Sequence, residues 1–153
     1  MASIDEEIQS KFENDYQKAI INIIYTANWL KNIHTNTLKP YGISAQQYNI
    51  LRILRGSGDW MAMTDVKSRM IENSPNTTRL ADKLLDAKLV QRKRSSTDRR
   101  VVFVKITDNG LKMLKDIDKS KSLNTEELGA KNISKKEAKK LSSILDKLRS
   151  GEE

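Results

Sequence analysis

Apolar residues recur every three or four positions along residues 5–35, a spacing that predicts one long amphipathic helix. The apolar positions are Phe12, Tyr16, Ala19, Ile23, Ala27 and Leu30, flanked by Ile20, Ile21, Ile24 and Tyr25. An apolar surface this broad needs two packing partners, of which one is the rest of the chain and the other could be a second chain. Pro40 and Gly42 end the helix.

The next helix is expected to begin at the N-cap Ser44 and to run through about Leu54, with Tyr48 and Leu51 facing inward. Residues 55–60 then read as a loop, because two glycines and a serine follow Arg55 closely.

Residues 60–63 could form a very short strand. Thr64 can cap a helix over residues 64–70, in which Val66 and Met70 share one face.

Residues 74–87 predict a further helix, with Ser74 as its N-cap and Pro75 at the first helical position. Its inner face comprises Leu80, Ala81, Leu84 and Leu85. The outer face is expected to carry Asn76, Thr77, Arg79, Asp82 and Lys83, with Thr78 near the boundary.

Residues 89–94 and 100–106 predict two strands, the second rich in β-branched residues, and the residues 95–98 between them favour a turn. Thr107 or Asp108 begins another helix with Leu111, Leu114 and Ile117 at its apolar positions. The last helix begins with the capping box Ser134-x-x-Glu137, and its narrow apolar seam comprises Ala138, Leu141, Leu145 and Leu148.

The order of these elements predicts a mainly α (α+β) fold of the winged helix-turn-helix type. Two short helices precede a β-hairpin, which is the wing, and longer helices stand at both ends of the chain. The second of the two short helices, residues 74–87, would be the recognition helix.

The positive charge of the chain is concentrated in its middle third. The net charge is 28 − 20 = +8, and residues 64–105 contribute 11 − 5 = +6 of it. Residues 91–100 alone contribute 5 − 1 = +4. Such clustering indicates a surface that binds a polyanion.

The predicted wing carries Arg99 and Arg100 beside its tip. Like charges so close repel one another, so an anion is expected to lie against them, and a protruding arginine fits a narrow minor groove. The base of the wing is lined by Arg92, Lys93 and Arg94. Asp98, the one acid of the wing, is expected to orient an arginine or to cap the turn.

The amino end of the recognition helix carries small hydrogen-bonding side chains and one arginine, and these can read base edges in the major groove. The candidate DNA-binding residues of the helix are Ser74, Asn76, Thr77, Thr78, Arg79 and, one turn further on, Lys83. Those of the wing are Arg94, Asp98, Arg99 and Arg100.

Residues 63–114 resemble the core of the MarR family of bacterial transcription regulators. The wing of that family reads D-x-R, here Asp98 to Arg100, and an apolar strand and L-T-x-x-G follow. The second motif corresponds to Ile106 to Gly110, with Ile in place of Leu, and residues 83–94 match the end of the recognition helix and the start of the wing. The turn at residues 70–76 lacks the glycine that is frequent in the family.

The resemblance implies a homodimer that binds a pseudo-palindromic site on double-stranded DNA, with Arg100 as the arginine of the minor groove. Residues 1–35 and 108–153 would form a helical dimerisation region, and residues 36–107 the winged helix-turn-helix region, within a single compact domain. It also implies a repressor that responds to a small aromatic or anionic effector. The candidate pocket residues are Tyr25, Trp29, His34, Tyr41 and Tyr48, although a place in the core or the dimer interface is the simpler interpretation for these aromatic residues.

Other functions find less support in the sequence. With one histidine, no cysteine and no convergent acid pair, we expect neither an enzyme nor a cofactor nor a metal site. The sequence shows no secretion signal and no membrane-spanning stretch, which fits a cytoplasmic protein. A winged-helix module that binds protein or RNA is the alternative, because the fold alone does not decide between these partners.

Overall fold

The computed structural model describes residues 2–72, 74–120 and 125–151. The chain divides into two compact units, residues 1–45 and residues 46–153. The division into a dimerisation region and a winged helix-turn-helix region concerns an assembly of two chains, and it stays a prediction.

The first unit contains α1 (Ile4–Glu7), α2 (Asp15–Leu38) and the 3₁₀ helix η1 (Lys39–Tyr41). The prediction of one helix from residue 5 is therefore wrong at its amino end. Gln9 takes a left-handed conformation with φ of 50°, and Asn14 caps α2 by accepting the Gln17 N–H at 2.9 Å. This side chain starts a new helix, so that Phe12 lies outside α2.

The carboxyl end of α2 agrees with the prediction. Pro40 lies in η1, and Gly42 follows with φ of 68°, a conformation that glycine adopts without steric cost.

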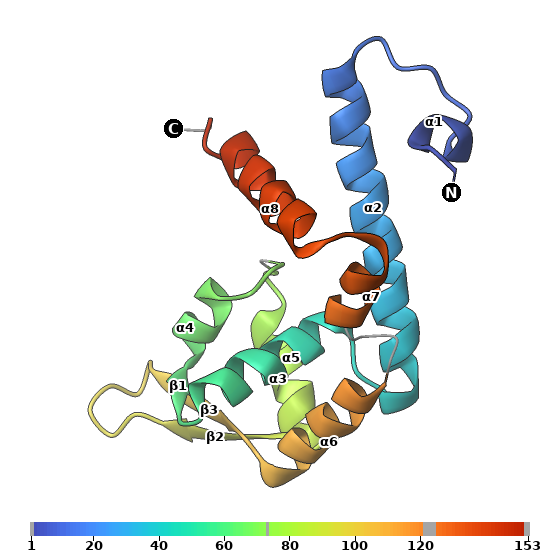
Figure 1. Ribbon diagram of the computed structural model, residues 1–153. Helices are drawn as coiled ribbons and strands as arrows, with labels where there is room; N and C mark the ends of the chain where they lie inside the picture. Colours follow the sequence, from blue (N-terminus) through green and yellow to red (C-terminus); the bar gives the residue numbers. More distant parts are fainter. Residues whose placement is uncertain (1, 73, 121–124, 152–153) are drawn as a thin grey trace. The chain divides into compact units, whose positions relative to one another are not determined.

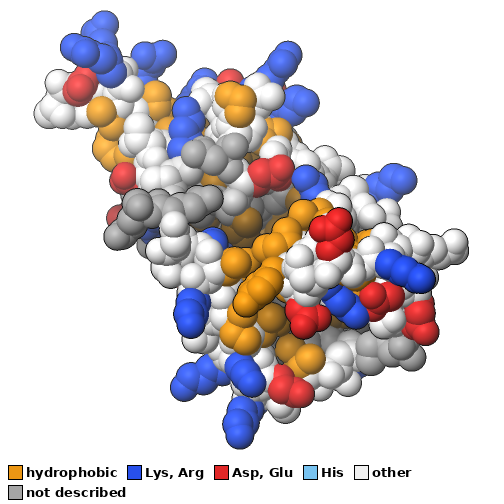
Figure 2. Space-filling view, turned by 90° about the horizontal axis from the view of Figure 1, so that it is seen from above, with side chains coloured by type: hydrophobic (Ala, Val, Ile, Leu, Met, Phe, Trp, Pro, Cys, Tyr) orange, Lys and Arg blue, Asp and Glu red, His pale blue; other side chains and the backbone are white. Residues whose placement is uncertain are grey.

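The broad apolar surface of α2 is confirmed, and it is largely exposed. Tyr16, Ile20 and Ile24 are 86%, 42% and 53% exposed, and Ile23, Tyr25 and Trp29 are exposed too. Hydrophobic side chains are accordingly visible at the surface in Figure 2. A helix with such a surface needs further packing to be stable in water.

The second unit begins within α3 (Ala45–Ser57), after its first residue, and continues with β1 (Met61–Ala62) and α4 (Met63–Ser68). α3 extends one turn beyond the prediction and includes Arg55, so the loop is shorter than residues 55–60. The short strand is confirmed. Thr64 does not cap α4, because the helix begins at Met63 and Ala62 is its N-cap residue.

The recognition helix α5 (Thr77–Asp86) begins later than predicted. Ser74 is not its N-cap and Pro75 is not its first residue. Instead the Ser74 carbonyl oxygen accepts the Thr77 N–H at 3.3 Å and the Thr77 hydroxyl at 2.8 Å, which closes a turn before the helix. Asn76 is the N-cap residue. The predicted inner face is confirmed by Ala81 and Leu84, which are buried.

The wing consists of β2 (Val90–Arg94) and β3 (Val102–Ile106), which are antiparallel and pair Val90 with Ile106. The sheet has the order β1-β3-β2, and Met61 of β1 pairs with Val104. Both predicted strands are confirmed, but the second begins at Val102 rather than at Arg100, and the loop between them extends away from the helices of this unit (Figure 1).

Three helices follow the wing, α6 (Asp108–Lys119), α7 (Thr125–Asn132) and α8 (Lys135–Arg149). The expected caps of α6 and α8 are confirmed, since Thr107 accepts the Gly110 N–H and Ser134 forms a capping box with Glu137. α7 was not predicted. On α8, Leu141, Ile144 and Leu148 are each about half exposed.

The core of the second unit joins the helices to the wing, and it confirms the predicted fold class. Its largest fully buried side chains are Ile50, Leu51, Leu54, Val66, Thr77, Leu84, Leu114 and Ile117. Val90, Val104 and Ile106 anchor the base of the wing in this core. None of the helices, as far as the structure describes them, is long and apolar enough to cross a membrane.

Candidate nucleic-acid interface

The tip of the wing is a hydrogen-bonded loop. The Ser95 N–H donates to the Val101 carbonyl oxygen at 2.9 Å, and the Val101 N–H donates to that of Asp98 at 3.0 Å. The Asp98 carboxylate accepts the Arg100 N–H at 3.0 Å. The expectation that Asp98 caps the turn is thereby confirmed, and the loop presents its arginines from a closed backbone.

The arginines of the tip point into solvent. The Arg100 side chain is 96% exposed, and its Nε lies 3.9 Å from Asp98 Oδ1. Arg99 is exposed as well, and its carbonyl oxygen accepts an N–H from Arg94 at 3.3 Å. A cation held at a protruding tip can enter a groove that the helices are too wide to enter.

The cations at the base of the wing have partners. Arg92 Nη1 lies 2.6 Å from Oδ1 of Asp82 on α5. Lys93 Nζ lies 4.3 Å from the ring centroid of Trp60, a cation–π geometry. The positive charge on this surface is therefore least compensated at the tip, beside Arg99 and Arg100.

The outer face of α5 differs from the prediction at one position. Asn76, Arg79 and Lys83 are exposed, as expected, and Thr78, which was predicted to lie near the boundary, is exposed too. Thr77 was predicted to lie on this face, but it is fully buried, and its hydroxyl donates to the Ser74 carbonyl. Thr77 lies four positions before Ala81 and seven before Leu84, so it shares their inner face of α5, and we do not include it among the proposed DNA contacts.

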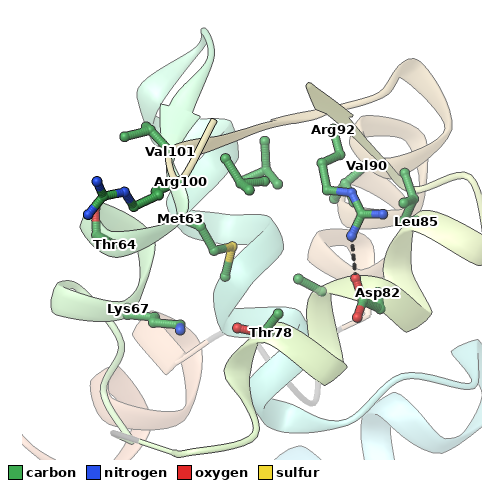
Figure 3. A pocket seen from close by; sticks show the side chains of 13 residues that line it. Met63, Thr64, Lys67, Thr78, Asp82, Leu85, Val90, Arg92, Arg100 and Val101 are labelled. Carbon is green, nitrogen blue, oxygen red and sulfur yellow. Dashed lines mark hydrogen bonds and ion pairs between the residues drawn. The ribbon is translucent and has the colours of Figure 1, made fainter. Parts of the chain in front are cut away.

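A cavity of about 230 Å³ separates the recognition helix from the wing. Its floor is apolar and includes Met63, Ala81 and Val104. Figure 3 shows Arg92 and Asp82 on one side of it, and Arg100, Thr64 and Lys67 on the other.

Sequence reasoning missed Thr64 and Lys67 as residues of this surface. They lie three positions apart on α4, and this spacing could have placed them on one outer face.

Two of the five candidate pocket residues lie together. Tyr25 and Trp29 line a hollow of about 610 Å³ in the first unit, with Lys18 and Asn22 beside them. The Tyr25 hydroxyl donates to a carboxylate oxygen of Glu7 at 3.0 Å, and this hydrogen bond raises the pKa of Tyr25.

The other three lie elsewhere. Tyr48 is buried on α3, and the Arg52 guanidinium lies 5.8 Å from its ring centroid. His34 and Tyr41 are half-buried and do not line the hollow. Among the described residues no group of three His, Cys, Asp or Glu side chains is placed to hold a metal ion.

Known proteins resemble this chain in the sequence of its central part and in the fold of nearly the whole chain. The family model "Transcriptional regulator SarA/Rot" matches residues 32–117, more than half of the chain. The HTH-type transcriptional regulator MhqR of Bacillus subtilis is 33% identical over 87 residues, which are 56% of this chain and 59% of MhqR. The chain spans about half the length of the curated relatives it matches.

Two solved structures are similar over nearly their entire length. A MarR transcription factor from Planctomyces limnophilus is 33% identical, with 92% of this chain and 100% of that chain covered and a TM-score of 0.67. A mutant of MarR from E. coli, solved in complex with operator DNA, is 21% identical, with 91% and 99% covered and a TM-score of 0.74. At that identity the second similarity concerns the fold alone.

Proposed function

This chain belongs to the MarR family of winged helix-turn-helix transcription regulators and matches the SarA/Rot family model, and on that premise we propose that it is a homodimeric repressor of pseudo-palindromic operators. The observation that carries the proposal is the pair of reading elements in the second unit. An almost fully exposed Arg100 stands at the wing tip, and the polar outer face of α5 stands beside the wing.

The proposed contacts use both grooves. The exposed side chains of α5, namely Asn76, Thr78, Arg79 and Lys83, would read base edges in the major groove. Arg100 and Arg99 would enter the adjacent minor groove, while Asp98 keeps the loop closed. Ser74, in the turn before α5, and Arg94, the last residue of β2, would contact the DNA backbone.

The proposed dimer rests on apolar surface that the single chain leaves exposed. Ile20 and Ile24 on α2, and Leu141, Ile144 and Leu148 on α8, form surfaces that a second chain can bury. Two winged units related by a two-fold axis would then meet half-sites about 34 Å apart, one turn of DNA.

The proposed regulation is a competition between dimer conformations. We propose that an aromatic or anionic effector binds in the hollow lined by Tyr25 and Trp29, where their rings can contact it and an anionic group would compete with Asp5 for Lys18. An effector that prefers a dimer with another spacing of the recognition helices would lower the DNA affinity by its differential binding, about 1–3 kcal/mol in typical cases. We propose no enzymatic activity, and we place the protein in the cytoplasm, where its DNA is.

Selection of sequences from random duplex DNA, followed by titration of the selected duplex, tests the proposal. The wild type should bind a pseudo-palindrome with a steep salt dependence. The Arg99→Ala/Arg100→Ala variant should lose most of this affinity, whereas Lys147→Ala on α8 should keep it. Equal binding by the wing variant would refute the wing contact, and binding to RNA or protein alone would refute the function.

A further inference from the structure

The acidic residue Asp82 has an unexpected position for a DNA-reading helix. It lies on α5, one turn beyond Thr78 and beside the exposed Lys83, where a carboxylate would repel phosphates. Its Oδ1 is 2.6 Å from Arg92 Nη1 on β2, and the two side chains are 48% and 46% exposed. The negative charge is thus compensated by the wing.

The ion pair connects the two elements that the proposed function brings to DNA. It lies at the mouth of the cavity between α5 and the wing, and Figure 3 shows the Arg92 side chain extending from its strand to Asp82. At the base of the wing α5 and β2 are in contact, and the Leu89 N–H donates to the Leu84 carbonyl oxygen at 2.9 Å, whereas the cavity extends from there to Arg100 in the wing loop. A polar link at the open side can therefore fix their separation.

Other contacts make the wing itself a coherent body. Its tip is closed by the hydrogen bonds of Ser95 and Asp98. Lys93 on β2 lies over the ring of Trp60, the residue that precedes β1. A change in how Arg92 meets Asp82 would consequently move the tip arginines as a group relative to α5.

We infer that Asp82 is a positioning residue, which holds the wing at a fixed distance from the recognition helix through Arg92 and thereby contributes to sequence-specific DNA binding. This inference rests on the proposed function. Asp82 acts through Arg92 and does not read a base itself, because its carboxylate is engaged by the guanidinium. Misplacement of the wing weakens specific binding, which needs both grooves in register, more than nonspecific binding, which needs charge.

The experiment compares the selected operator with a shuffled duplex of equal length at several salt concentrations. The Asp82→Asn/Arg92→Gln variant removes the ion pair at unchanged net charge, so its salt dependence and nonspecific affinity should equal those of the wild type. Its ratio of specific to nonspecific affinity should fall about fivefold, the scale of one partly exposed pair. Asp82→Asn alone removes one negative charge and leaves Arg92 without its partner, so it should strengthen nonspecific binding and steepen the salt slope by about 0.9.

Two further variants serve as controls. Asp86→Asn/Lys88→Gln makes the same change of charge at the exposed end of α5 and should keep the ratio of specific to nonspecific affinity. Arg92→Lys retains a cation for the single contact with Asp82 and should keep most of that ratio.

An unchanged ratio in Asp82→Asn/Arg92→Gln would overturn the inference, and so would a new preferred base in sequences selected by Asp82→Asn, which would mean direct reading. Neither result would affect the proposed function, which instead fails if the wild type selects no duplex.

Discussion

Gly110 on α6 lies directly against the backbone of Leu89, so closely that a Cβ at Gly110 would meet the Leu89 carbonyl oxygen at 2.4 Å and Ile106 Cγ1 at 2.6 Å. Helix propensity alone would favour alanine here by about 1 kcal/mol. The carbonyl belongs to the backbone and cannot rotate away, so we expect Gly110→Ala to lower the free energy of unfolding by about 1–3 kcal/mol, as overpacking does. Urea denaturation measures this change.

The matched control for that substitution is Gly56→Ala on α3. A Cβ at Gly56 meets nothing within 4 Å, so alanine should raise the free energy of unfolding by about 0.5–1 kcal/mol. Equal effects of the two substitutions would mean that the contact of Gly110 with Leu89 does not determine the residue type.

Substitution of Thr77 should affect the stability of the protein, and substitution of Thr78 should affect its recognition of DNA. Thr77 is fully buried and its hydroxyl donates to Ser74, so Thr77→Val should cost about 1 kcal/mol of stability and leave the preferred DNA sequence unchanged. Thr78 is exposed, so Thr78→Val should change stability by less than about 0.5 kcal/mol and alter the base preference. Denaturation and sequence selection on both variants check these expectations. A changed base preference in Thr77→Val, with a loss of stability in Thr78→Val, would contradict the faces that the two residues occupy on α5.

The exposed apolar surface of α8 should control the association of two chains. Leu141 is half exposed, and Leu141→Glu places a charge in the surface that we propose a second chain covers. We expect a shift from dimer to monomer in analytical ultracentrifugation, together with loss of the concentration dependence of the melting temperature. Ser143→Glu adds the same charge on the opposite side of the helix and should leave the dimer intact; a monomeric wild type would contradict the proposal.

The amino end of α8 should depend on pH. The Ser134 hydroxyl and backbone N–H both donate to the Glu137 carboxylate, and these hydrogen bonds hold the pKa of Glu137 below its ordinary value of 4.5. Because the folded pKa is depressed, this stabilisation is present above 4.5 and is lost as the pH falls through the folded pKa. The protection factors of the amides in the first turn of α8, which are corrected for the intrinsic pH dependence of exchange, should therefore fall at low pH, and Glu137→Gln should abolish that change.

Most elements of the second unit were predictable, because their signals are local, although α7 was not predicted. Ser134 caps α8 as its spacing to Glu137 predicts, Thr107 is the cap at the expected start of α6, and the β-branched run of β3 forms the expected strand. Local signals also compete with one another. At the amino end of the chain the periodicity suggested one helix, but the cap at Asn14 and the left-handed Gln9 divide it.

The site was less predictable than the fold, because it depends on which face a residue occupies and which partner it meets. Ser74 is a good N-cap by type, yet its carbonyl closes a turn before α5, and it accepts the hydroxyl of Thr77, which is buried on the inner face of the helix. The cations of the wing could be counted from the sequence. Whether Arg92 meets Asp82 or a phosphate depends on contacts between residues that are distant along the chain, and no local pattern reports these.

Thr107 connects the segment before β2 with the end of β3 and the start of α6. The Thr107 hydroxyl donates to the Lys88 carbonyl oxygen at 2.7 Å and accepts the Gly110 N–H at 3.1 Å, while its own N–H donates to the Leu89 carbonyl at 3.0 Å. The start of β2, the end of β3 and the first turn of α6 are thus fastened at one point. If α6 rotates, the hairpin must therefore rotate with it about this point. Because the tip of the wing lies far from the point, a small tilt of α6 becomes a larger displacement of the tip.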